Sequence, residues 1–188
     1  MQTLFPLESV FPQGFLYVPD FISEAEEAAL YQAAVKLERQ AFSFQGYEAK
    51  RKVASFGYDW SFEHQRLTKG EDIPAVFEPL IEKVAARLSI EKERFVELLV
   101  TEYPVGAVIN WHRDAPPFDL IAGISLQADC TFRLRPYEKA KQQRNAVLSL
   151  PVKRRSLYVM QGAARTDWQH SIAAVTKVRY SITLRTLK

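Results

Sequence analysis

Cysteine is almost absent from this chain of 188 residues, in which Cys130 stands alone. One cysteine cannot form a disulfide within the chain, and it excludes a metal site built from several thiolates. No apolar run approaches the ~20 residues that a membrane-spanning helix needs. The first residues also lack the basic and apolar regions of a secretory signal. We therefore expect a cytoplasmic protein with no membrane partner, nucleoid-associated if bacterial, whose metal sites would use histidine and carboxylate ligands.

Charge is unevenly distributed along the chain. Residues 133–188 hold 13 Lys/Arg and 2 Asp/Glu, a charge of +11, whereas residues 1–132 hold 12 Lys/Arg and 20 Asp/Glu, a charge of −8. Either the C-terminal half binds a polyanion such as nucleic acid, or opposite charges face each other within one domain. The residues that would grip phosphates are Lys139, Lys141, Arg144, Lys153, Arg154 and Arg155.

The length suits a single domain over residues 1–188, and the chain has no repeat or linker. Ser23 to Glu26 form a capping box, which predicts a helix with an apolar stripe at Ala29, Leu30, Ala33 and Leu37. Asp72 and Pro74 are expected to open a second helix, whose apolar residues are Phe77, Leu80, Ile81, Val84 and Leu88. Between the helices, residues 42–71 have a strand-and-loop pattern.

The remainder of the chain is rich in short β-type runs separated by turn-forming residues. These runs are 96–103, 107–111, 120–126, 131–134, 146–150, 156–160 and 178–187. They predict a barrel or sandwich of about eight strands. Helices that precede strands in this way favour an α+β fold with the helices packed on the outside of one sheet.

Histidine is also scarce, with three in the chain, and two of them accompany an aspartate in a metal-binding pattern. His112 and Asp114 follow a strand, and residues two apart on an extended backbone point to the same face. His170 lies just after a strand-like run. Two histidines and one carboxylate form the facial triad of non-haem iron(II) oxygenases. The alternative for His112 is a surface turn, and His64 is expected to be solvent-exposed.

The last strand alternates strictly between apolar and polar residues. Its polar face carries Arg179, Ser181, Thr183 and Arg185. If this face lines a pocket, the arginines can bind a dianion through charge-assisted hydrogen bonds. Their α-carbons would lie ~20 Å apart, so each arginine would serve a different end of the site. The alternative is an edge strand with a solvated face.

The order of these motifs resembles that of the AlkB-like iron(II)- and 2-oxoglutarate-dependent dioxygenases. The family pattern is His-x-Asp, a distant histidine and two arginines separated by five residues, here His112/Asp114, His170 and Arg179/Arg185. The resemblance runs roughly from Phe15 to Arg185. Its further segments are Gln13–Phe21 as a first strand, Thr101–Ala107 as an Asn-x-Tyr-x-x-Gly motif, and Gln161–Arg165 as a Gly-rich approach to the second histidine.

The resemblance implies a double-stranded β-helix (jelly-roll) core that holds iron(II) and uses 2-oxoglutarate and O₂. Arg179 would bind the remote carboxylate of 2-oxoglutarate with help from the Tyr103 hydroxyl, and Arg185 would lie nearer the metal. Thr101 and Ser181 stand where the family often has asparagine, so their shorter side chains would alter the cosubstrate site. The reaction would release succinate and CO₂ and hydroxylate a C–H bond, and a hydroxylated N-methyl group would break down to formaldehyde.

The resemblance also implies a substrate, alkylated DNA or RNA, and a substrate lid at about residues 42–71. Tyr58 and Trp60 on this lid could stack on a flipped base, although they could equally cover the helices. Arg165 would point into the substrate pocket. Asp114 is followed by Ala115-Pro116-Pro117, where members that repair nucleic acid often carry acidic residues, so the lesion is not specified.

Other interpretations of the same residues remain open at this stage. The same chemistry could act on a protein or a small molecule. The chain could instead be a nucleic-acid-binding module with an inactive metal site. A zinc hydrolase would use the same ligands but would leave the two arginines without a role. A monomer with no obligate protein partner is expected.

Overall fold

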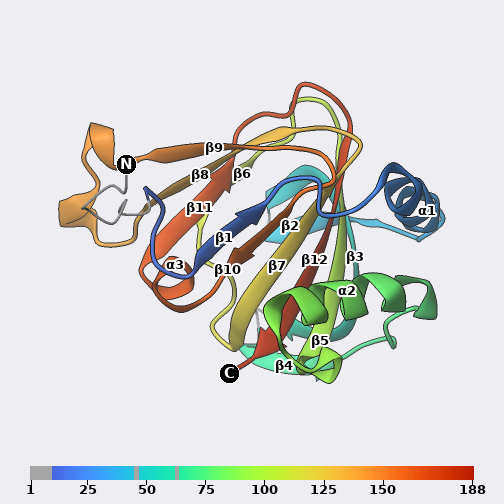
Figure 1. Ribbon diagram of the computed structural model, residues 1–188. Helices are drawn as coiled ribbons and strands as arrows, with labels where there is room; N and C mark the ends of the chain where they lie inside the picture. The colour runs from blue at the N-terminus through green and yellow to red at the C-terminus, as the bar shows by residue number, and fades with distance from the viewer. Residues whose placement is uncertain (1–9, 45–46, 62–63) are drawn as a thin grey trace, which may run out of the picture.

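The computed structural model describes residues 10–44, 47–61 and 64–188. Two antiparallel sheets dominate the fold (Figure 1). The elements are β1 (Phe15–Val18), α1 (Glu24–Val35), β2 (Gln40–Phe44), β3 (Tyr47–Ser61), β4 (Arg66–Lys69), α2 (Glu78–Leu88), β5 (Phe95–Tyr103), β6 (Ile109–His112), β7 (Phe118–Leu126), β8 (Cys130–Pro136), β9 (Leu148–Val152), β10 (Leu157–Met160), α3 (Gly162–Thr166), β11 (Trp168–Ile172) and β12 (Arg179–Leu187). Short 3-10 turns cover Ala75–Phe77, Lys92–Arg94, Lys139–Lys141 and Arg144–Ala146.

The main sheet has the strand order β1-β10-β7-β12-β5-β3-β2, with β4 attached to β3, and the smaller sheet has the order β6-β11-β8-β9. Residues such as Phe132 from β8 and Ile121 from β7 fill the space between the sheets. This double-sheet arrangement confirms the expected jelly-roll core, because alternate residues of both sheets point into one shared core. The described residues form twelve strands, more than the eight expected.

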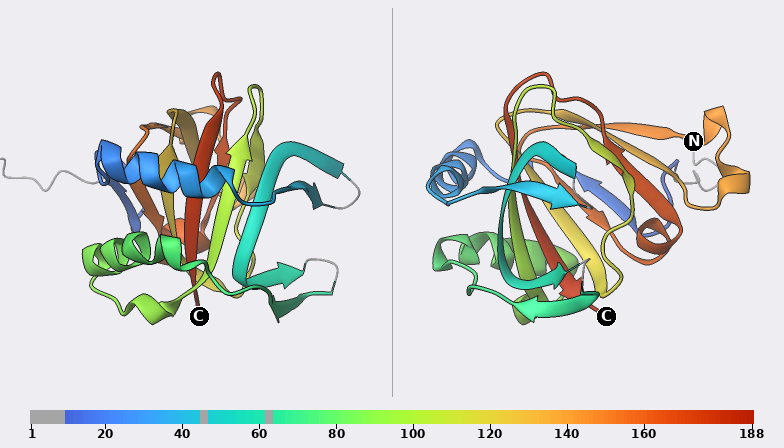
Figure 2. Two further views of the ribbon diagram at one scale, coloured as in Figure 1. Left: turned by 90° about the vertical axis from the view of Figure 1, so that its right-hand side faces the viewer. Right: turned by 180° about the vertical axis from the view of Figure 1, so that it is seen from behind.

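Both long helices lie along the outer face of the main sheet (Figures 1 and 2). Leu30 of α1 and Val84 of α2 join a second buried cluster with sheet residues such as Leu98. No helix of the described residues is long and apolar enough to cross a membrane.

The capping box is confirmed, since Ser23 Oγ accepts from the Glu26 N–H at 3.2 Å and Glu26 Oε2 accepts from the Ser23 N–H at 2.7 Å. Two details of the expected helices are wrong. Ala29 is exposed, and Glu27 is buried on the inner face of α1 instead. The second helix begins at Glu78, because the residues after Pro74 first form a 3-10 turn.

Strand β12 lies between β5 and β7 in the middle of the main sheet. This position excludes the interpretation of its polar residues as the solvated face of an edge strand. Arg179 is fully buried, and Ser181 and Thr183 are buried as well. The sheet interior therefore contains a row of polar groups that must find partners.

Strand β3 bends sharply over the face of the main sheet. Residues 52–57 pair with β5, and residues 58–61 pair with β4. Gly57 has φ +82°, and a Cβ there would lie 2.0 Å from the Val96 carbonyl oxygen, so only glycine fits. The bend carries the end of β3 toward the open side of the jelly roll (Figure 2).

Candidate metal centre and cavity

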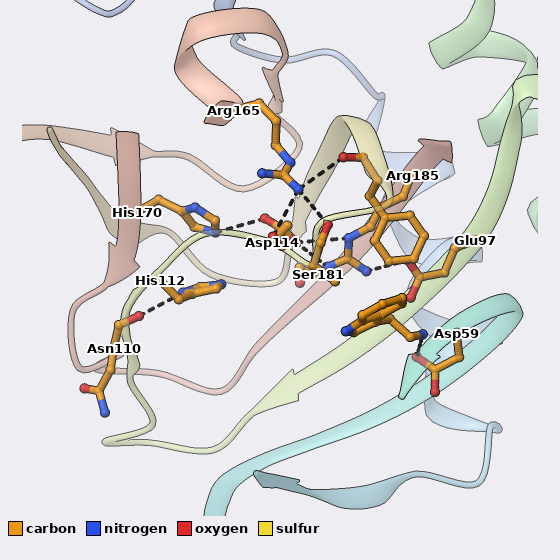
Figure 3. A network of polar contacts seen from close by, with 12 residues as sticks. Asp59, Glu97, Asn110, His112, Asp114, Arg165, His170, Ser181 and Arg185 are labelled. Atoms are coloured by element: carbon orange, nitrogen blue, oxygen red, sulfur yellow. Dashed lines mark hydrogen bonds and ion pairs between the residues drawn. The ribbon is translucent and has the colours of Figure 1, made fainter. Parts of the chain in front are cut away.

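Pairing of β6 with β11 brings the two histidines together. His112 and His170 are direct partners in the register, and their ring centroids are 4.2 Å apart. The sequence suggested that His170 follows a strand, but the structure places it inside β11. Asp114 lies in the loop after β6, and its Oδ2 is 3.5 Å from His170 Nε2 (Figure 3). One potential ligand atom from each of the three residues lies within 4.8 Å of the others, which suits a single metal ion.

Both imidazoles are suited to act as neutral ligands. His112 Nδ1 is 2.8 Å from the Asn110 carbonyl oxygen, so Nδ1 carries the proton and the Nε2 lone pair is free. Burial, followed by the nearby His112, lowers the pKa of His170 to about 3. His170 is therefore neutral at physiological pH, the form that binds a metal.

The carboxylate of Asp114 is ionised, and one of its two oxygens has hydrogen-bond donors among the described residues. Burial raises its pKa, but the positive charge of the neighbouring Arg185 opposes burial, and the pKa lies below its usual value. Arg185 donates to Oδ1 from Nε and Nη2. Oδ2 is buried without a hydrogen-bond partner among the described residues. A cation between this oxygen and the two imidazoles would supply the missing partner, so the donor set fits iron(II).

Glu97 is a site residue that the sequence analysis missed. It is 2% exposed on β5, and its Oε2 accepts from Arg185 Nη1 at 2.8 Å. Burial raises its pKa, against the opposing charge of Arg185. The available signal was a lone carboxylate inside the apolar run Phe95–Tyr103, where an unpaired charge is costly.

The buried Arg179 has the features of an anion-binding residue. Its Nε donates to Ser125 Oγ at 2.9 Å, but Nη1 and Nη2 have no partner among the described residues. Its Cζ lies 4.8 Å from the centre of the Tyr103 ring, and the Tyr103 hydroxyl is 3.4 Å from Ser181 Oγ. A buried guanidinium with free N–H groups fits a carboxylate such as that of 2-oxoglutarate. Ser125 had no signal in the sequence.

Arg165 contacts the backbone of the loop that carries Asp114. It is 7% exposed, and its Nη2 donates to the carbonyl oxygens of Asp114, Ala115 and Phe118 at 3.0, 2.7 and 3.1 Å. Arg165 is not among the residues that line the cavity. Arg165 therefore fixes the backbone of the loop that carries the candidate metal ligand Asp114.

A cavity of about 1320 Å³ opens between the smaller sheet, β5 and the bent strand β3. His112, Asp114 and His170 all line it. Other predicted residues in its lining are Thr101, Tyr103, Arg185 and Trp60. The structure does not bring Arg179, Ser181 or Tyr58 to the cavity surface, and Tyr58 is 36% exposed.

The basic segment Lys153–Arg155 is paired with acidic residues of the same molecule. Lys153 binds Asp129 at 2.9 Å, and Arg154 binds the buried Glu27 at 2.6 Å. Arg155 binds Asp20 at 2.9 Å. None of these residues lines the cavity. For this segment, the interpretation of opposite charges facing each other within one domain is the better one. His64 is exposed, as expected.

Comparison with known proteins places this site in a recognised context. Residues 14–185 match the family described as the 2OG-Fe(II) oxygenase superfamily. The mouse protein named tRNA (carboxymethyluridine(34)-5-O)-methyltransferase ALKBH8 is 29% identical over 167 residues, which cover 86% of this chain and 24% of that protein. The zebrafish protein named probable RNA/DNA demethylase ALKBH6 is 26% identical over 172 residues, covering 87% of this chain and 71% of that protein. The chain therefore spans about a quarter of the first of these relatives.

Solved structures share the fold at lower identity. The structure of OsALKBH1 has a TM-score of 0.73 at 13% identity and covers 96% of this chain and 100% of that one. A prolyl hydroxylase from Trichoplax adhaerens, in complex with a hypoxia-inducible-factor peptide fragment, has a TM-score of 0.65 at 16% identity, covering 93% and 83%. The same fold therefore occurs in proteins that share little sequence identity with this chain.

Proposed function

The chain belongs to the 2OG-Fe(II) oxygenase superfamily as an AlkB-like, 2-oxoglutarate-dependent dioxygenase that uses Fe(II) and O₂, and from this premise we propose that it removes N-alkyl groups from nucleobases in DNA or RNA. The observation that carries the proposal is the cavity beside His112, Asp114 and His170. It is large enough for a base together with its flanking groups, and two aromatic residues of the bent strand β3, Phe56 and Trp60, line it.

His112, Asp114 and His170 are the proposed iron ligands. Two neutral imidazoles and one carboxylate leave the remaining positions open for cosubstrate and O₂. Arg185 holds Asp114 through Oδ1 and leaves Oδ2 for the metal. Bound Fe(II) and 2-oxoglutarate supply the oxidation of a substrate C–H bond by O₂, with succinate and CO₂ as the other products.

Arg179, Tyr103, Ser181 and Thr101 are the proposed cosubstrate residues. The Nη groups of Arg179 have no hydrogen-bond partner among the described residues, and this guanidinium is fully buried over the Tyr103 ring, where water is excluded. A charge-assisted pair formed there is stronger than one in solvent. The position of Arg185 beside Asp114 fits the expectation that it serves the metal end of the site.

The substrate lid proposed at about residues 42–71 corresponds to β2, β3 and β4. Trp60 lines the cavity and is the proposed base-stacking residue, whereas Tyr58 of the same strand is exposed and does not line it. Arg165 would influence substrate binding through the Asp114 loop that it clamps. We propose that residues 1–188 form one dioxygenase domain.

Formaldehyde release from a substrate panel tests the proposal. Oligonucleotides of DNA and of RNA carrying methylated adenine or methylated cytosine are incubated with the protein, Fe(II), 2-oxoglutarate and O₂. Formaldehyde is expected from at least one of them, and from none with His112→Ala, Asp114→Ala or His170→Ala, which should stay folded because these side chains face the cavity. Formaldehyde from no methylated oligonucleotide would move the assignment to a protein or small-molecule substrate.

A second measurement separates the metal site from the substrate. Fe(II) and 2-oxoglutarate added without oxygen should produce a weak visible charge-transfer band. An inactive metal site or a zinc hydrolase would produce no such band. Full 2-oxoglutarate turnover by a folded His170→Ala protein would remove His170 from the ligand set.

A further inference from the structure

Two arginines on the outer face of the smaller sheet lie against one tryptophan. Arg133 and Arg135 of β8 point away from the core, since the residues between and beside them, Phe132 and Leu134, are buried. Their side chains cross β11, and their guanidinium carbons lie 5.1 and 4.4 Å from the centre of the Trp111 ring on β6. A tryptophan face with two cations on it is an organised surface feature.

A third arginine extends this feature toward the cavity. Arg113 lies between the two candidate metal ligands His112 and Asp114, and it lines the cavity mouth. Its guanidinium carbon is 3.5 Å from the centre of the Tyr137 ring, which is 49% exposed. We name the group Trp111, Arg113, Arg133, Arg135 and Tyr137 the arginine–aromatic face.

The three arginines of this face carry uncompensated charge. Arg133 donates to Ser171 Oγ, Arg135 to Gln169 Oε1 and Arg113 to the Thr166 carbonyl oxygen. All three acceptors are neutral. Within the described ranges 10–44, 47–61 and 64–188, none of these arginines forms an ion pair with a carboxylate. They differ in this from Lys153, Arg154 and Arg155, whose charges are neutralised within the molecule.

We infer that the arginine–aromatic face binds single-stranded nucleic acid, an inference that rests on the proposed function and extends it. Guanidinium groups without a carboxylate partner suit phosphate oxygens, and aromatic rings at the surface, here the exposed Tyr137 and the partly exposed Trp111, suit the faces of bases. The face reaches the cavity mouth at Arg113, so a strand with one base in the cavity can continue across it. It contributes affinity for the strand next to the base that reacts.

Binding of unmethylated strands isolates the face from the chemistry. A labelled oligothymidylate and a labelled oligouridylate are titrated with protein across a salt series, and anisotropy is recorded. Arg133→Gln combined with Arg135→Gln should weaken binding on the order of tenfold at about 0.1 M salt. The slope of log affinity against log salt should fall by about 1.4, because each phosphate neutralised on a single strand contributes ~0.7. Arg133→Lys with Arg135→Lys should retain the slope.

The aromatic part of the face has its own signature. Trp111→Leu should weaken binding by about fivefold or more with little change in salt slope, because stacking carries no charge. Trp111→Phe should recover most of the loss. Arg113→Gln tests the contribution of charge at an exposed side chain of the same face. Thermal unfolding of every variant shows whether it is folded.

The matched control is Lys36→Gln with Arg87→Gln, which removes two exposed charges from the helices on the far side of the main sheet. This pair should bind as the parent does. Equal weakening by both pairs would reduce the effect to net charge and overturn the inference. Unchanged binding by the folded Arg133/Arg135 variants would overturn it as well.

Formaldehyde release from methylated oligonucleotides, measured on the same samples, separates the two ideas. If formaldehyde is released equally by the parent and by the variants of the arginine–aromatic face, the face is excluded as a binding surface and the demethylase assignment stands. If oligonucleotides bind through the face in a salt-dependent way but no formaldehyde is released, the demethylase assignment is excluded and the face stands. Binding of polyglutamate in place of oligonucleotides would assign the face to an acidic protein and overturn the inference.

Discussion

Arg185 donates two hydrogen bonds to a single oxygen of Asp114, from Nε at 3.1 Å and from Nη2 at 2.8 Å. The same guanidinium also donates to Glu97 from Nη1. One cation therefore stabilises two buried carboxylates, and it leaves Asp114 Oδ2 directed at the histidines. The orientation of the proposed metal ligand depends on a residue 71 positions further along the chain.

Loss of this guanidinium should destabilise the protein and weaken metal binding. Arg185→Met leaves Asp114 and Glu97 buried without their cation, and breaking such a pair costs about 3–5 kcal/mol. Urea unfolding of the metal-free protein and Fe(II) titration measure the two effects. Adding Glu97→Gln to Arg185→Met removes one stranded carboxylate and should recover part of the stability. Unfolding of Arg185→Met at the parent's urea midpoint would show that the pairs contribute little.

Substitution of Arg179 should affect the cosubstrate most. Arg179→Ala removes the guanidinium whose Nη groups have no partner among the described residues, and loss of one member of a buried charged pair costs ~2–5 kcal/mol. The Michaelis constant for 2-oxoglutarate should rise far more than in Arg185→Lys, which keeps a charge beside Asp114. A Michaelis constant that barely moves in Arg179→Ala would require the cosubstrate to bind elsewhere.

Acid should destabilise the metal-free protein through His170. Its pKa is about 3 in the folded state, because of burial and then His112, against an ordinary value of 6.5. Below pH 6.5 the unfolded chain therefore takes up a proton that the folded chain refuses, so stability falls as pH falls toward 3. At roughly pH 5.5 the loss is about 1.4 kcal/mol.

The check compares unfolding free energies of the metal-free parent and His170→Gln at neutral pH and near pH 5.5. The parent should lose more stability than the variant by about that amount. Parallel pH dependence in the two proteins would mean that folding does not lower the pKa of His170.

Substitutions of Trp60 and Tyr58 should have different effects on demethylation. Trp60 lines the cavity, whereas Tyr58 on the same strand is exposed outside it. Trp60→Ala should weaken use of a methylated oligonucleotide by ~1–3 kcal/mol, the contribution of one stacked base. Tyr58→Ala should have a much smaller effect and serves as the matched control. Equal losses in both variants would mean that the substrate also contacts the exposed side chain of Tyr58 outside the cavity.

The chemistry of the site was readable from local sequence. Histidine scarcity made His112, Asp114 and His170 conspicuous, and the alternation of the last strand singled out Arg179 and Arg185. Each of these signals depends on residue type and short spacing, which a strand converts directly into side-chain direction. The capping box of α1 is local in the same way, and it formed as expected.

Partnership between distant residues was not readable in this way. Glu97 and Ser125 joined the site because β5, β12 and β7 lie side by side, and no local pattern encodes strand order. The basic stretch at the C-terminal end looked uniform in sequence. Folding neutralised Lys153–Arg155 against acidic residues near α1 and left Arg133 and Arg135 beside Trp111, without a carboxylate partner among the described residues.

The sequence by itself thus determined which groups we propose as iron and 2-oxoglutarate ligands, because ligand type and strand periodicity are properties of neighbouring residues. Only the tertiary structure decided which charges are neutralised, which aromatic residues of β3 line the cavity and which carboxylates share Arg185. The physical reason is that charge pairing and burial depend on distances through space. Those distances are set by the order of the strands and by the bend at Gly57.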